Sequence, residues 1–391
     1  MKNSICINAG QIFTPTVVLQ DSCVVVNDAG RIEFVGPRAK APTDAAQTIQ
    51  ADDLRLSPGL VDIHVHGGYG IGFGIGDKWE ADLEKYSNWV IKSGVTDFLC
   101  TLSAGTHKEL CEMMETYVSY LEKGTPGAKA IGIHLEGPYL NPERKGAFNP
   151  AWLRTPSVAE AHDFLRIGGK WLKQMTMAPE LPNAVEVAAE FRKAGVTVAL
   201  GHSNTDYDTA RAALMGDFTH VTHTYNAQTG LNHRAPGVVG AVLSSDEITG
   251  ELIADGIHVD VGAMRVLLRA LGTQRVVLIT DAIPGAGLPD GVYSSIGQTI
   301  TVKDGRATLA NGTLAGSSAV LNDCVRNAHV LAGASVQDAI RMATLNPAKV
   351  IHMQDELGVI ATGRKADMIL MDEDFNVRMS MADGKVIYSD L

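Results

Sequence analysis

The chain has 391 residues, of which 45% are hydrophobic and 20% are charged. A chain of this length and composition buries one large core or two modest ones, which excludes an extensively disordered protein. The formal net charge of -11 argues against nucleic acid or an anionic membrane as the main partner, because both bind basic patches.

The cysteines and the apolar runs indicate the compartment. Five cysteines are an odd number, and they show no C-x-x-C spacing, so neither a disulfide framework nor a thiolate zinc site is expected. The apolar run near the N-terminus is too short for a signal peptide. No stretch approaches the roughly 18 apolar residues that span a bilayer. We therefore expect a cytoplasmic protein without a membrane-spanning segment.

Both ends of the chain are rich in strand-forming residues. Residues 1–56 and 358–391 alternate short β-rich runs with turn signals such as D-A-G at 28–30 and A-D-G at 382–384. Two β-rich ends that flank one large middle indicate that the termini meet in space. We expect them to form one small β-sandwich domain that the middle of the chain interrupts.

The middle, residues 57–357, alternates apolar strand patterns with amphipathic helical patterns such as 80–94, 184–195 and 205–216. It contains eight strand candidates, at 60–66, 95–102, 130–136, 172–180, 196–203, 220–227, 250–258 and 275–282. Chemically active residues recur at the ends of many of these strands, and no G-x-G-x-x-G fingerprint opens a helix after the first. An α/β fold of the (β/α)8, TIM-like barrel type is therefore favoured over a doubly wound sheet. The glycine-rich stretch 67–74 is expected to be a flexible loop at the barrel mouth.

Glu136 follows the apolar run of the third strand, and Gly137 and Pro138 end the strand directly after it. A buried carboxylate is costly unless it is paired or binds a metal. Glu136 is therefore a candidate metal ligand at a strand tip. The alternative is that it caps the next turn or pairs with Arg144 or Lys145.

Histidines and one aspartate end several other strands. His64 and His66 lie at i and i+2, on one face of the first strand. The remaining strand-end residues are His202, His223, His258 and Asp281. A single histidine at a strand end is more often structural than a ligand. With Glu136, however, six strands end in a histidine or a carboxylate, and this repetition predicts the site of a metal-dependent hydrolase.

Several segments also carry a family resemblance, in this order along nearly the whole chain: PGLVDIHVHGG, HLEGPYLNPERKGA, GHSN, THTYNAQTGLNHRAPGVVGA, IADGIHVD, LITDA, LAGSS and MATLNPAKVIH. Through these segments the sequence resembles the amidohydrolase superfamily and, within it, the N-acetylglucosamine-6-phosphate deacetylases. HLEGP and the H-R-x-P-G block are the specific part, since amidohydrolases in general share only H-x-H and the final aspartate.

The resemblance implies a set of roles. Glu136, His202 and His223 would bind a divalent metal, with zinc expected and Fe2+, Mn2+ or Co2+ as alternatives. Asp281 would take a proton from the attacking water and return it to the departing amine. The residues implied to contact an amino sugar phosphate are Ala147, Asn226, Ala227, Arg234, His258, Leu314, Ala315 and Gly316. In relatives the arginine crosses a dimer interface, so a homodimer is expected, with a tetramer as an alternative. A solvated surface arginine is the other reading of Arg234.

Two positions depart from the family pattern. Phe148 stands where many relatives place a histidine that could orient the amide. His64 and His66 are present, whereas some single-metal relatives lack this pair. Our hypothesis is a second metal, held by His64, His66 and a bridging Glu136; the alternative is one metal, with the histidine pair vacant or hydrogen-bonded.

Other functions are also compatible with the sequence. The substrate could be another N-acetylated sugar phosphate, such as the galactosamine epimer, or a cyclic amide. Against the cyclic amide, no strand-end lysine suggests a carbamylated bridge between metals. A barrel kept only for binding is a third alternative, which the intact Asp281 and metal ligands disfavour.

Overall fold

A computed structural model describes residues 4–43, 45–103, 105–295 and 297–391 of the chain. Eight parallel strands form one sheet in the order β14-β13-β12-β11-β10-β9-β8-β5. Their bounds are β5 Leu60–Asp62, β8 Val95–Leu102, β9 Lys129–Glu136, β10 Leu172–Met177, β11 Thr197–Leu200, β12 Phe218–Val221, β13 Thr249–Ile253 and β14 Val276–Ile279. All eight predicted strands are confirmed.

The two edges of this sheet meet just beyond β5 and β14. The backbone N–H of Asp281 donates to the carbonyl of His64 over 2.9 Å, and the N–H of His66 donates to the carbonyl of Ala282, also over 2.9 Å. The sheet therefore closes into a barrel, in agreement with the expected (β/α)8 fold. Every residue of β8 is buried, as expected for a parallel strand covered on both faces.

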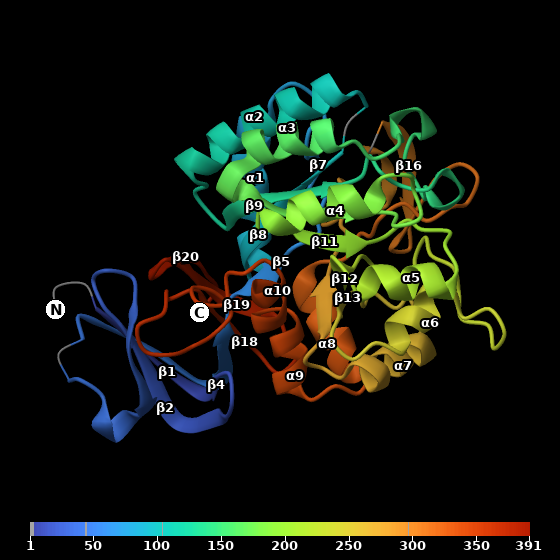
Figure 1. The fold of residues 1–391 in the computed structure, drawn as a ribbon. Helices are drawn as coiled ribbons and strands as arrows, with labels where there is room; N and C mark the ends of the chain where they lie inside the picture. The colour runs from blue at the N-terminus through green and yellow to red at the C-terminus, as the bar shows by residue number, and fades with distance from the viewer. Residues whose placement is uncertain (1–3, 44, 104, 296) are drawn as a thin grey trace.

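Helices surround the barrel (Figure 1). The α-helices are α1 Trp79–Val90, α2 His107–Lys123, α3 Val158–Gly168, α4 Ala184–Lys193, α5 Tyr207–Leu214, α6 Gly237–Leu243, α7 Val261–Leu271, α8 Leu321–Val330, α9 Val336–Met342 and α10 Leu345–Val350. Short 3-10 helices are η1 Arg38–Lys40, η2 Ile91–Ser93, η3 Pro142–Arg144, η4 Pro150–Trp152 and η5 Gly169–Trp171. The three predicted helices correspond to α1 with η2, to α4 and to α5.

A second sheet joins the two ends of the chain, in the order β20-β19-β18-β4-β1-β2-β3. Its bounds are β1 Ile5–Phe13, β2 Val18–Val26, β3 Ile32–Pro37, β4 Gln47–Pro58, β18 Met368–Met371, β19 Val377–Ala382 and β20 Lys385–Ser389. Figure 1 shows the blue N-terminal and red C-terminal strands side by side at the lower left. The sheet is continuous and folds over onto itself, because β3 also bonds to the segment before β18, through Ile32 N–H and the Arg364 carbonyl at 2.9 Å.

The folded sheet encloses a core of its own. Ile7, Val24 and Ile32 from the N-terminal strands pack in one cluster with Met368 and Met379 from the C-terminal strands. This packing between strands far apart in sequence accounts for the meeting of the termini that the composition indicated. Within the described residues, no helix is long and apolar enough to cross a membrane.

Two further β elements lie near the mouth of the barrel. The glycine-rich stretch contains a two-stranded hairpin, β6 Gly67–Gly68 and β7 Ile71–Gly72, whose four strand residues are buried. The prediction of a flexible loop there was wrong, because the hairpin packs against α1. A three-stranded sheet, β15 Gly291–Ser295, β16 Gln298–Lys303 and β17 Arg306–Thr308, follows β14 and was not predicted.

Candidate active site

The candidate catalytic side chains come from the carboxyl ends of five barrel strands. Glu136 is the last residue of β9. His202, His223 and Asp281 each lie two residues beyond the end of a strand, respectively β11, β12 and β14. The pair His64 and His66 follows β5. Because the carboxyl ends of parallel strands meet at one face of a barrel, side chains distant in sequence converge there.

Glu136 lies at the centre of this group and is 2% exposed. Its Oε1 is 3.1 Å from Nε2 of His202 and 3.1 Å from Nε2 of His223. Its Oε2 is 2.9 Å from Nε2 of His66 and 3.4 Å from Nε2 of His64. One carboxylate thus contacts a histidine pair on each side. Among the described residues, Glu136 forms no ion pair with Arg144 or Lys145, which was the alternative.

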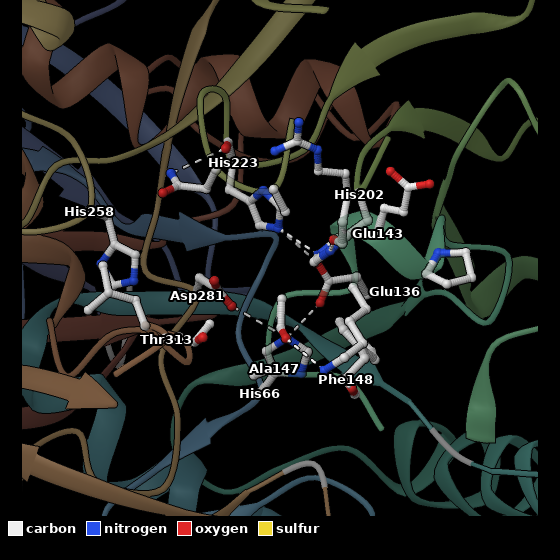
Figure 2. Close-up of a pocket in the computed structure, with 18 of the residues that line it drawn as sticks. His66, Glu136, Glu143, Ala147, Phe148, His202, His223, His258, Asp281 and Thr313 are labelled. Atoms are coloured by element: carbon white, nitrogen blue, oxygen red, sulfur yellow. Dashed lines mark hydrogen bonds and ion pairs between the residues drawn. The ribbon is translucent and has the colours of Figure 1, made fainter. Parts of the chain in front are cut away.

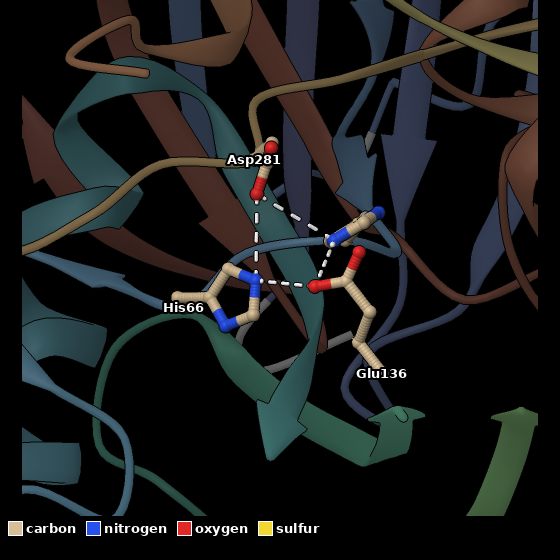
Figure 3. Close-up of side chains that lie close together, drawn as sticks. His66, Glu136 and Asp281 are labelled. Carbon is tan, nitrogen blue, oxygen red and sulfur yellow. Dashed lines mark hydrogen bonds and ion pairs between the residues drawn. The ribbon is translucent and has the colours of Figure 1, made fainter. Parts of the chain in front are cut away.

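Asp281 faces the first histidine pair from the other side. Its Oδ1 lies 3.4 Å from His66 Nε2 and 3.5 Å from His64 Nε2 (Figure 3). Two sets of side chains are therefore close enough to bind an ion each, one made of His64, His66, Glu136 and Asp281 and the other of Glu136, His202 and His223. Glu136 belongs to both sets, as the hypothesis of a bridging carboxylate requires.

The donor atoms of these sets fit divalent cations. His202 Nδ1 donates to the carbonyl of Arg144 over 2.7 Å, which leaves its Nε2 without a proton in the neutral ring. That bare nitrogen lies 3.0 Å from His223 Nε2 as well as beside Glu136. His64 Nε2 is buried and has no hydrogen-bond partner among the described residues. Facing lone pairs at such distances are stable only with a cation or a proton between them, so the residues present fit a metal.

The charges of the site have the same consequence. Burial acts to raise the pKa of Glu136, but the charge of His64 and the contacts with the His202 and His223 rings hold that pKa well below its usual value. Burial acts to lower the pKa of His64, whereas the carboxylates of Glu136, Glu251 and Asp281 raise it well above its usual value. The carboxylates of Glu136, Glu251 and Asp281 thus favour a positive charge among them, either a proton or a metal ion.

A cavity of about 510 Å³ opens above these residues (Figure 2). Of the predicted substrate residues, those that line it are Ala147, Asn226, Ala227, His258, Leu314 and Gly316. Ala315 instead packs behind the wall with Ile283 and Ile300. His64 is fully buried beneath the cavity. The cavity is large enough for a small ligand such as a sugar phosphate.

Arg234, like Ala315, is a predicted substrate residue that does not line the cavity of its own chain. It is exposed, in the stretch 231–235 of the loop between β12 and α6. This loop protrudes at the right of Figure 1, in yellow-green. Two other cations do line the cavity, Arg144 and Lys145. Nε of Arg144 donates to Asn204 Oδ1 over 2.8 Å, and Nζ of Lys145 donates to the Phe148 carbonyl over 3.1 Å.

Phe148 packs edge-on against the ring of His202, with ring centroids 5.2 Å apart. It is 4% exposed and adds an apolar wall to the cavity. This wall can exclude water from the ligand His202, but it offers no hydrogen bond to a substrate carbonyl.

Two supporting carboxylates were missed by the sequence reasoning. Glu251 of β13 is fully buried, and its Oε2 accepts from His64 Nδ1 over 2.8 Å. Asp255 Oδ2 accepts from His258 Nδ1 over 2.7 Å, which turns the other ring nitrogen of His258 towards the cavity. A glutamate inside the apolar run GELI was a usable signal. No pattern in the sequence announces the contact between Asp255 and His258.

Comparison with known proteins gives the wider context. The model of the amidohydrolase family matches residues 55–387. The chain belongs to the amidohydrolase family, and the resemblance drawn from its motifs is confirmed. The chain is 35% identical over 378 residues to N-acetylglucosamine-6-phosphate deacetylase of Haemophilus influenzae, with 96% of this chain and 97% of the relative covered.

Two more amidohydrolases illustrate the range of relatives. N-acetylgalactosamine-6-phosphate deacetylase of Escherichia coli O157:H7 is 34% identical over 337 residues, which covers 86% of this chain and 89% of the relative. The crystal structure of N-acetylglucosamine-6-phosphate deacetylase from Pasteurella multocida matches with a TM-score of 0.92 at 32% identity. It covers 98% of this chain and 99% of its own. The likeness therefore includes the barrel and the sheet from both termini.

Proposed function

We propose that this amidohydrolase hydrolyses the acetamide of N-acetylglucosamine 6-phosphate to glucosamine 6-phosphate and acetate. The observation that carries the proposal is Glu136, which contacts a histidine pair on each side and lies beside Asp281 at the floor of a cavity of sugar size. Relatives that match nearly the full chain are deacetylases of this kind.

We propose that the cofactor is zinc, with Fe2+, Mn2+ or Co2+ as alternatives. Glu136, His202 and His223 would hold one ion, and His64, His66 and Glu136 the second. Imidazole nitrogens and carboxylate oxygens are ligands that zinc accepts, and a catalytic site keeps a position open for water. When bound, such ions lower the pKa of water and polarise the carbonyl of an amide.

The chain's own residues then have defined tasks. Asp281 Oδ1 accepts the proton of the attacking water as its oxygen bonds to the acetyl carbon. The same oxygen returns this proton to the nitrogen as the C–N bond breaks, which releases the free amine and acetate. Phe148 excludes water beside His202. The carboxylates of Glu136 and Asp281 line the same end of the cavity, where they favour a neutral amide over an anionic group of the substrate.

The substrate's other end would lie at the upper part of the cavity. Asn226 and the backbone of Ala227 would bind the phosphate, and His258 would contact the sugar or its amide. The partner subunit's Arg234 would complete the phosphate site in a homodimer, or in a tetramer built from such dimers. An arginine fork matches phosphate geometry, and Arg234 lies on an exposed loop and does not line its own cavity.

The remaining inferences concern the organisation and location of the chain. We propose that residues 57–357 form the catalytic domain and that 1–56 with 358–391 form the second domain. We also propose a cytoplasmic location, since all five cysteines are free thiols in the structure and four of them are buried.

Acetate release from a panel of sugars tests the proposal. The panel contains the 6-phosphates of N-acetylglucosamine and N-acetylgalactosamine, and both unphosphorylated sugars. We expect the highest kcat/KM for N-acetylglucosamine 6-phosphate. A preference for the galactosamine epimer would assign the alternative function, which the relative from E. coli O157:H7 makes relevant. No release from any member of the panel would refute deacetylation. A metal count tracked against activity distinguishes one ion from two.

A further inference from the structure

Glu251 is a buried carboxylate beneath the candidate metal centre, outside the cavity and with 0% exposure. Its Oε2 accepts from His64 Nδ1 over 2.8 Å and from the backbone N–H of His223 over 2.9 Å. Its Oε1 accepts from Gln174 Nε2 over 2.9 Å and from His220 Nε2 over 3.2 Å. Four donors thus converge on one carboxylate, two of them belonging to residues of the metal centre.

The contact with His64 decides which of its ring nitrogens carries the proton. A carboxylate accepts hydrogen bonds and cannot donate them, so Nδ1 of His64 must be the protonated nitrogen. Nε2 of the neutral ring is then bare, and it is this atom that faces Glu136 and Asp281. With the opposite tautomer, His64 would present a proton to the cation position and could not be a ligand.

The contact with His223 acts on the backbone rather than on the ring. His223 has a positive φ of 25°, in a region that residues other than glycine rarely adopt. The hydrogen bond from its N–H to Glu251 helps to hold the chain in that conformation, and with it the direction in which the His223 ring leaves the strand end. The same carboxylate oxygen therefore touches one residue from each of the two candidate ligand sets.

We propose that Glu251 is a positioning residue that fixes His64 and His223 together and so couples the two metal half-sites. This inference rests on the proposed metal-dependent function. No lysine or arginine is within salt-bridge distance of Glu251 among the described residues, so its burial is offset by hydrogen bonds from neutral groups and histidines. Its charge adds to those of Glu136 and Asp281, which brings the surroundings of two divalent cations closer to neutrality.

The first test compares Glu251→Gln with Gln174→Leu. Glutamine has one acceptor oxygen in place of two, so it cannot serve both pairs of donors. Gln174→Leu perturbs the same buried layer and removes a donor to Oε1, but Gln174 touches neither His64 nor His223. Zinc binding to each protein is measured by equilibrium dialysis at controlled free zinc, with elemental analysis.

We expect Glu251→Gln to weaken binding of the ion held by His64 and His66 by about 10- to 100-fold, the range typical of residues that support metal ligands. The affinity for the ion held by His202 and His223 should decrease less, because Glu251 contacts only the backbone of His223. Gln174→Leu should bind both ions within a factor of about 3 of the original affinity. Equal zinc affinities in the wild type and Glu251→Gln would overturn the proposal, as would an equal loss in both variants.

A second measurement needs no variant of Glu251 and no substrate. Long-range 1H–15N spectra of the metal-free wild-type protein, labelled at histidine and assigned with His64→Asn, report the tautomer of His64. We expect a proton on Nδ1, whether or not Nε2 also carries one. A proton on Nε2 alone would refute the positioning role even if Glu251→Gln failed to fold. Neither measurement depends on acetate release. The role of Glu251 therefore stays testable if the proposed substrate is wrong, and the proposed substrate stays testable if the role of Glu251 is wrong.

Discussion

Asp281 Oδ1 lies within 3.5 Å of Nε2 of both His64 and His66, at the floor of the cavity. We expect Asp281→Asn to lower kcat by at least about 10²-fold, because an amide can neither accept the proton of the water nor return it to the amine. The ion bound by Glu136, His202 and His223 should remain, since Asp281 is not part of that set.

Steady-state kinetics with a metal count on the same sample measure this effect. Asp304→Asn is a suitable control, because Asp304 is exposed in a turn with φ of 50°, a conformation that asparagine tolerates. Near-normal turnover in Asp281→Asn would remove Asp281 from the mechanism.

Arg234 gives a prediction about recognition rather than chemistry. If this arginine binds the 6-phosphate, Arg234→Ala should raise the free energy of binding of the phosphorylated substrate by roughly 2 to 5 kcal/mol, as for the loss of one member of a desolvated charge pair. The rate with unphosphorylated N-acetylglucosamine should hardly change. The measurement is kcat/KM on both sugars, with the exposed Arg306→Ala as control. Equal losses on the two sugars would assign Arg234 a structural role.

For single residues of the site, the sequence predicted those at the ends of strands better than those that support them through hydrogen bonds. His202 and His223 were identified because each follows an apolar run directly, a pattern contained within one short segment of the sequence. The role of Glu251 depends on contacts with His64 and Gln174, which lie on other strands. Such contacts follow from the barrel's closure and register, which no local pattern encodes.

Among the elements, β9 is tied to its surroundings at both ends. Glu136 at its carboxyl end belongs to the site, and Lys129 at its amino end forms an ion cluster. Nζ of Lys129 lies 3.3 Å from Asp97 of β8, 2.7 Å from Asp367 before β18 and 3.1 Å from Asp383 after β19. One lysine therefore connects the barrel to the sheet formed by the termini.

Lys129→Met should lower the free energy of unfolding by about 3 to 5 kcal/mol, because it leaves Asp97, with 1% side-chain exposure, buried without a cation. Burial raises the pKa of Asp97 to about 6, even though the Lys129 charge acts to lower it. A raised aspartate pKa means that the stability present at low pH is lost as the pH rises through about 6. Without the Lys129 charge, the ionised Asp97 destabilises the folded state more. The decrease in the free energy of unfolding caused by Lys129→Met should therefore be larger at pH 8 than at pH 5.

Thermal and denaturant unfolding at these two pH values measure the effect. The matched control is Asp383→Asn, which removes the charge of a partner with 56% side-chain exposure, keeps a residue that tolerates the φ of 46° at this position, and should cost less than about 1 kcal/mol. Destabilisation of Lys129→Met that does not depend on pH would contradict the role of Asp97.

The repeat of strands and helices made the barrel predictable, since each strand showed a continuous apolar run. The sheet β15–β17 escaped prediction although β16 alternates exposed and buried residues in the manner of a half-buried strand. It comes after the eighth barrel strand and belongs to no β/α repeat. The hairpin of β6 and β7 escaped because four glycines in alternation look like a mobile loop, whereas here they allow close backbone packing.

For the whole molecule, the exposed loop with Arg234 predicts shared active sites. Arg234→Ala and Asp281→Asn are each expected to be poorly active alone. If the arginine acts across a two-fold interface, a mixed dimer contains one site with both defects and one with neither. Random exchange in an equal mixture makes half of the dimers mixed, so about a quarter of all sites should regain activity on the phosphorylated sugar.

A mixture of Asp281→Asn with His202→Asn controls for exchange itself, because both of those defects stay in their own subunit and every site keeps one. Absence of recovery with Arg234→Ala, under conditions in which labelled subunits demonstrably exchange, would place the arginine in the site of its own chain.

The position of β4 in the sheet of the termini has a consequence for synthesis on the ribosome. The stretch Arg55–Pro58 of β4 pairs with Met368–Met371 of β18, about 310 residues later in the chain. At roughly 5 to 20 residues per second, this edge of β4 waits about 15 to 60 seconds for its partner. An unpaired strand edge is a site of aggregation, and the nascent N-terminal strands are thus exposed while the whole barrel is being made. Chaperone demand should therefore concentrate on the first strands to emerge, although they lie far from the chemistry.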